Sequence, residues 1–142
     1  MKKFIVVILA IGLIIFIAIQ FIPYGHQHTN PAVIQEPNWD SPQTQEIAQR
    51  ACFDCHSNET KWPWYSYVAP VSWLIQKDVV DGRRNLNFSD WSRVREPNEI
   101  SEVVSAGWMP PARYLAMHPE AKLTQAEKDA LVSGLQATAS GK

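Results

Sequence analysis

The most prominent pattern in the chain is an apolar run near its N-terminus. Every position in Phe4–Ile22 is apolar except one glycine and one glutamine. A helix of this length spans the roughly 30 Å hydrocarbon core of a bilayer. Lys2 and Lys3 precede the run, and the positive-inside rule keeps such an end in the cytoplasm. The pattern predicts a transmembrane anchor at residues 1–23, with the remaining chain on the periplasmic, extracytoplasmic side of the cytoplasmic (inner) membrane.

A cleaved signal peptide is the alternative interpretation of this run. The apolar core of such a peptide usually covers about 7–15 residues and ends in an A-x-A-like site. The run here is longer, and the sequence Ile-Pro-Tyr-Gly at 22–25 offers no such site. The length favours an uncleaved anchor, with Tyr24 at the membrane interface.

Residues 24–40 follow without an apolar period. Pro31, Pro37 and several polar residues are typical of a linker. His26 and His28 could bind a metal, but in an exposed tether they are better explained as polar spacers.

Helical periods begin at Ser41, which is a suitable N-cap in front of a proline. The helix that it opens carries Ile47, Ala48 and Ala51 on one side and runs into Cys52. A second helix begins beside Pro70, and its end is predicted at Gly82.

Three further helices are predicted in the C-terminal half. Ser89 is a credible cap for the first, and Phe88 and Trp91 are available for its core contacts. The second follows Pro97 and ends at Gly107. The last opens with a capping box, in which Thr124 is followed by Glu127, and its inner side carries Ala130, Leu131 and Leu135. No stretch alternates at period two, so the fold is predicted to be all-α, with a domain at 41–138 and a tail at 139–142.

Length and charge restrict the function classes. The 142 residues suffice for one domain and an anchor. Without the two N-terminal lysines the chain has 11 basic against 14 acidic residues. Nucleic-acid binding would require a basic face, so we expect no nucleic acid as a partner.

The chemistry is concentrated at Cys52, Cys55 and His56. These residues form the C-x-x-C-H pattern of covalent c-type haem attachment, and the chain has no other cysteine. The two thiols would add to the haem vinyl groups, and His56 would be the proximal iron ligand. Its second ring nitrogen would donate to a backbone carbonyl and so fix the tautomer. We expect one covalently attached haem c.

Three other uses of the cysteine pair are less consistent with the sequence. A thioredoxin-like pair needs a βαβ setting, and no β-rich run precedes Cys52. A zinc site needs a fourth ligand, and no second half-site is present. A disulfide between residues three positions apart is geometrically awkward.

Other residues could complete a haem pocket. The aromatic segment Trp62–Tyr67 could form a wall around a flat cofactor or simply pack in the core. Arg83 or Arg84 could pair with a haem propionate, although a solvated arginine is the default.

The sixth iron position has two candidate ligands. Met109 precedes Pro110 and Pro111, which stiffen the loop that would hold its thioether toward the iron. His118 is the alternative and would give bis-histidine ligation, although it could also simply end a helix before a proline. Met117 lies within a helical stretch, where core packing is preferred.

The order of the haem helix, the Met-Pro-Pro loop and a last helix opened by Leu-Thr-x-x-Glu resembles class I c-type cytochromes over residues 41–137. More closely, the chain resembles the membrane-anchored bacterial proteins of the haem-binding (Haem_bd) domain family. The matching segments are Cys52–Thr60, Trp62–Trp73, Asp78–Arg83, Leu86–Trp91 and Met109–Pro111. The resemblance implies haem binding and a small helical cytochrome c-like domain.

The leading hypothesis is a one-electron carrier tethered to the membrane. Two protein ligands would leave the iron no open position, so we expect no enzymatic activity and no small-molecule substrate. The expected partners are the membrane and redox proteins. The alternatives are a sensor in which a small ligand displaces Met109, and a peroxidase with an open iron and either His118 or Arg113 as its distal residue.

Overall fold

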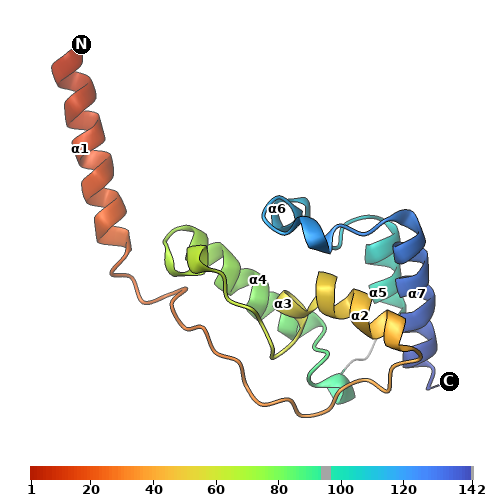
Figure 1. The fold of residues 1–142 in the computed structure, drawn as a ribbon. Coiled ribbons are helices and arrows are strands. Elements are labelled where there is room, and N and C mark those ends of the chain that lie inside the picture. Colours follow the sequence, from red (N-terminus) through yellow and green to blue (C-terminus); the bar gives the residue numbers. More distant parts are fainter. Residues whose placement is uncertain (94–96, 142) are drawn as a thin grey trace.

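The computed structural model describes residues 1–93 and 97–141, and within them every regular element is helical (Figure 1). The all-α prediction is therefore confirmed. Two short segments form an isolated β-bridge between Gln35 and Asp90. Lys142, the last residue of the predicted tail, lies outside the described residues. The α-helices are α1 (Lys2–Ile19), α2 (Pro42–Ala51), α3 (Phe53–His56), α4 (Val71–Asn85), α5 (Pro97–Ser105), α6 (Ala112–Leu115) and α7 (Gln125–Ala139), and the 3₁₀ helices are η1 (Trp64–Tyr67), η2 (Trp91–Arg93) and η3 (Pro119–Ala121).

Helix α1 projects away from all the other helices (Figure 1). None of its residues is buried, and it is long and apolar enough to cross a membrane. The helix ends at Ile19, a little before the predicted end of the apolar run. A helix that is apolar on all its faces, as this one is, favours an apolar surrounding such as a bilayer.

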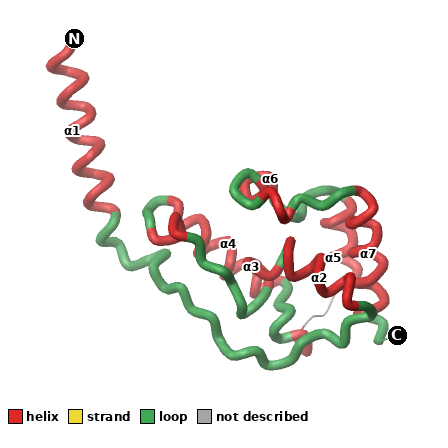
Figure 2. The backbone as a smooth tube through the Cα atoms, in the orientation of Figure 1, coloured by secondary structure: helices red, strands yellow, loops and turns green. Residues whose placement is uncertain are grey.

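The segment between α1 and α2 lacks helices, as a linker should, and Figure 2 shows it running along one edge of the helical domain. Asn30 donates to the Thr60 carbonyl, Asn58 donates to the Ala32 carbonyl, and the Ile34 N–H donates to the Ser89 carbonyl. The segment is exposed along most of its length, as predicted for a tether, but it is also fastened to the domain because side-chain amides and backbone N–H groups pair across the contact.

His28 differs in the same way from the predicted polar spacer. Its Nε2 lies 3.0 Å from the Ser66 carbonyl oxygen. Its ring contacts the rings of Trp62 and Tyr67, with centroids 4.5 and 4.1 Å away. This packing was not predictable, because an aromatic contact between a loop and a 3₁₀ turn leaves no periodic pattern in the sequence.

The core lies between α2, α5 and α7, with Ile47, Ala48, Leu131 and Leu135 buried. Helix α2 begins as predicted, with the Ser41 hydroxyl accepting from the Thr44 N–H at 3.2 Å. Helix α7 opens with the predicted Thr124–Glu127 capping box.

The two helices α2 and α7 approach each other closely at Gly134. A Cβ at this glycine would lie 2.0 Å from the Thr44 Oγ1, so a larger residue would push the two helices apart. This close approach brings the end of α2, and with it the cysteine motif, against the C-terminal half of the chain.

Two predicted boundaries were wrong for related reasons. Gly82 was expected to end its helix, but α4 continues to Asn85. A Cβ at Gly82 would lie 2.4 Å from the Cys55 carbonyl oxygen, so this glycine serves a close approach and not a helix end. Ser89 was expected to cap a helix, but its hydroxyl accepts from the Asn58 N–H, and only the 3₁₀ turn η2 follows.

Candidate functional site

A pocket of about 730 Å³ opens between α2–α3, α4, α5, α7 and the Met109–Pro111 loop. Its volume lies in the range of cofactor sites, which is about 300–1,000 Å³. Apolar side chains form its inner wall, among them Leu86, Phe88, Ile100 and Leu131. The pocket therefore suits a large ligand that is mostly apolar.

Cys52, Cys55 and His56 all line this pocket. Helix α2 ends at Ala51, and the next turn is closed by hydrogen bonds from the N–H groups of Cys55 and His56 to the Cys52 carbonyl, at 3.2 and 2.9 Å. This tight turn brings both sulfurs and the imidazole to one pocket wall. The cysteines are not joined in a disulfide.

The orientation of His56 is set by α4. Its Nδ1 lies 3.0 Å from the Gly82 carbonyl oxygen and 3.2 Å from the Leu86 carbonyl oxygen. Because carbonyls only accept, Nδ1 carries the proton and Nε2 keeps its lone pair for a metal, which is the arrangement expected from the sequence. Burial lowers the pKa of His56, although the two backbone hydrogen bonds oppose this effect, so the imidazole is neutral at pH 7.

The thiols lie in surroundings that oppose their ionisation. Burial raises the pKa of Cys52 and of Cys55 to about 12. Zinc binding and thiol–disulfide exchange both use the thiolate. Moreover, the described residues contain no cluster of three or more His, Cys, Asp or Glu that could hold a metal ion. The raised thiol pKa values make the metal-free cysteine pair slow in thiol–disulfide exchange.

Met109 also lines the pocket. After α5 the chain reverses at Gly107, which has a φ of 74°, and the Trp108 N–H donates to the Val103 carbonyl at 3.0 Å. This is a Schellman-type helix end, and it needs a residue that tolerates positive φ. The turn places Met109 half-buried against the core, so His56 and Met109 share one pocket.

His118, the alternative sixth ligand, lies elsewhere. It does not line the large pocket but borders a second one of about 310 Å³. Its Nε2 is 2.7 Å from the Tyr65 hydroxyl, its Nδ1 is 3.1 Å from the Glu120 carboxylate, and its ring stacks on Tyr114. Both of its ring nitrogens are thus engaged, and it lies in a different pocket from His56.

The other predicted pocket residues separate into two groups. Arg84 lines the pocket, together with Lys77 and Arg113. Arg83 does not, because its guanidinium donates to backbone and side-chain oxygens on the opposite side, including the Ser57 and Thr29 carbonyls. The aromatic segment Trp62–Tyr67 is also absent from the lining, so the suggested haem wall is instead formed by core residues of α5 and α7.

One contact between the two sides of the pocket was not predicted from the sequence. The Tyr114 hydroxyl, on α6, donates to the Asp54 carboxylate at 2.8 Å. Asp54 occupies the spacer between the two cysteines, and Tyr114 lines the pocket. Burial and this hydrogen bond raise the pKa of Tyr114. Nothing in the spacing of residues so far apart in the sequence signals the pair.

The donor set agrees with haem as the ligand. It combines two neutral thiols, an imidazole with its Nε2 lone pair available, a thioether and an apolar wall, and cationic side chains are present at the rim for propionates. The family comparison gives the same answer, since the model described as "Haem-binding domain" matches residues 14–137.

The chain belongs to the haem-binding domain family. No curated protein and no solved structure matches it. Membership assigns haem to this protein, and the geometry identifies the pocket that can hold it. The matched region of this haem-binding protein begins within α1 and includes the segment that follows the domain surface.

We expect Gly82→Ala to lower both stability and haem content. The new methyl group would meet the Cys55 carbonyl at 2.4 Å and push the cysteine motif away from α4. Overpacking of this kind costs about 1–3 kcal/mol. The checks are denaturant unfolding and the ratio of haem to protein in the purified sample.

Val80→Ala is the matched control, because Val80 lies on the exposed face of the same helix. It should leave the haem content unchanged. A Gly82→Ala protein with full haem content and unchanged stability would contradict the close approach described here.

Proposed function

We propose that this protein is a c-type haem protein that carries single electrons on the extracytoplasmic face of the cytoplasmic membrane. The observation that supports this most strongly is that His56 and Met109 line the same pocket. With both as ligands, the iron would keep no position for a substrate. Bound haem supplies an iron that alternates between the ferric and ferrous states, and the protein itself transforms no substrate.

Cys52 and Cys55 would anchor the haem covalently. Each sulfur would form a bond to a vinyl carbon, and the thiol hydrogen would end on the neighbouring carbon, so the attachment would consume no oxidant or reductant. The raised pKa values of Cys52 and Cys55 favour this attachment, because disulfide formation proceeds through the thiolate and would otherwise consume the cysteines first. His56, held by α4, fixes the plane in which the cofactor binds.

The pocket residues would also tune the iron. A thioether ligand raises the reduction potential relative to a second imidazole. The Nδ1 hydrogen bonds of His56 increase its basicity as a ligand. On the rim, Arg84 and Lys77 both pair with Asp81, and a propionate would compete with that carboxylate.

Helix α1 would confine the carrier to the membrane plane. Lys2 and Lys3 precede the span, which favours an N-terminus in the cytoplasm and a haem domain outside it. Covalent haem attachment in bacteria takes place on that side. Confinement raises the effective concentration of the carrier toward membrane-bound redox partners.

Removing the cysteines tests covalent attachment. In the wild-type protein, produced with a c-type haem maturation system, we expect the haem to stay on the polypeptide after acid denaturation and organic extraction. In the double variant Cys52→Ala, Cys55→Ala the haem should be fully extracted. A wild-type haem that is extracted just as easily would contradict the c-type proposal while leaving haem binding intact.

The axial ligands can be tested by optical spectroscopy of the oxidised protein. Methionine ligation gives a weak long-wavelength band, which should be lost in Met109→Ala and retained in His118→Ala, because His118 lies outside the pocket. Met109→Ala should also lower the reduction potential. A band that survives Met109→Ala, or a spectrum changed only by His118→Ala, would overturn this ligand assignment.

A further inference from the structure

The residues that follow α1 contact the haem domain at the start of α4. The Gln20 side-chain amide donates to the Ala69 carbonyl at 3.0 Å, and its oxygen accepts from the Ala69 N–H at 2.9 Å. Gly25 packs against Ser72 so closely that a Cβ would lie 2.8 Å from the Ser72 carbonyl carbon. The loop between η1 and α4 is therefore held where α1 ends.

Four large apolar side chains around this loop are exposed. We call Trp64, Tyr67, Val71 and Leu74 the junction patch. Trp64 and Tyr67 are three residues apart on η1, and Val71 and Leu74 are three apart on α4, so each pair shares one face of its helix. Trp64, Val71 and Leu74 also border the smaller pocket of about 310 Å³, so they form one continuous surface.

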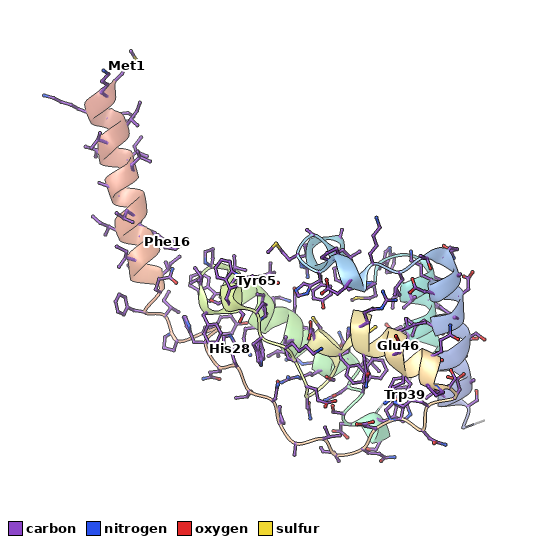
Figure 3. All side chains as sticks on the ribbon, in the orientation of Figure 1. Met1, Phe16, His28, Trp39, Glu46 and Tyr65 are labelled. Carbon is purple, nitrogen blue, oxygen red and sulfur yellow. The ribbon has the colours of Figure 1, made fainter. Side chains whose placement is uncertain are left out.

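The position of this patch relative to α1 indicates what covers it. Figure 1 shows α1 leaving the domain at the end where α4 begins, and Figure 3 shows Tyr65 and His28 at that same end. Phe21 and Tyr24, which connect the helix to the domain, are exposed as well. Tryptophan and tyrosine are enriched where proteins meet the headgroup region of a bilayer.

We propose that the junction patch rests on the headgroup region of the bilayer that α1 spans. This inference depends on the proposed membrane anchoring and adds a second contact to it. The contacts of Gln20 and Gly25 connect the domain to the span, and an apolar contact with the bilayer beside them would fix its orientation relative to the membrane. The lipid surface is favoured over a protein partner because the patch adjoins the end of the span and is rich in interfacial residue types.

A fixed orientation also determines the height of the haem. Helix α4 leads from the patch at Val71 to the pocket. The α4 residues that line the pocket lie between Lys77 and Asn85. At about 1.5 Å per residue, the α4 residues that line the pocket lie about 10–20 Å along the helix from Val71. The haem would therefore stay near the membrane surface, where the exposed part of a membrane-bound partner could reach it.

The test compares two tryptophans in the same molecule. Trp64 is 77% exposed and Trp108, beside the haem ligand loop, is 71% exposed, so without a membrane contact both should be oxidised at similar rates. The full-length haem protein is placed in nanodiscs that hold one copy each, which excludes a contact with a second copy. Hydroxyl-radical footprinting with mass spectrometry then measures the oxidation rate of each residue.

We expect Trp64 to be oxidised several-fold more slowly than Trp108. The double variant Val71→Ser, Leu74→Ser should weaken the contact and raise the Trp64 rate toward that of Trp108, with the haem spectrum unchanged. Equal rates in the wild-type nanodisc sample would overturn the inference and leave the anchor proposal standing. Failure of the protein to co-elute with nanodiscs would instead contradict the anchoring itself.

Discussion

The hydrogen bonds from His56 Nδ1 to the Gly82 and Leu86 carbonyls are the contact on which the site depends. They exist only because the cysteine turn lies directly against α4, and Gly82 permits that approach by lacking a side chain. One glycine thus determines the distance between two helices, and that distance determines the orientation of the imidazole and the position of both thiols. Substitution at this position would affect the ligand, its tautomer and the attachment points together.

The opposite side of the pocket is held by separate interactions. The Schellman-type end of α5 positions Met109, and packing of α5 and α7 supplies the apolar wall. The hydrogen bond from Tyr114 to Asp54 connects this side to the cysteine turn. The pocket is therefore closed by contacts between segments far apart in the sequence. The two candidate iron ligands also come from different segments, His56 from the cysteine turn and Met109 from the loop after α5.

Elements defined by local signals were predictable from the sequence. The Ser41 cap, the Thr124 capping box and the C-x-x-C-H turn each depend on residues a few positions apart. Gly82 and Ser89 were misassigned because both have a local meaning, helix end and helix cap, that a tertiary contact overrides. The packing of residues 24–40, and the location of His118 in a different pocket from Met109, depend on long-range contacts that leave no periodic pattern.

With His56 and Met109 as its two protein ligands, the haem iron would have no open position. Exposure of the reduced protein to carbon monoxide tests this most directly, because the gas binds ferrous haem only at a free or weakly held site. We predict that the spectrum of the reduced protein stays unchanged under carbon monoxide at neutral pH. Prompt formation of a carbon monoxide adduct would contradict the electron-carrier account and favour a ligand-binding haem.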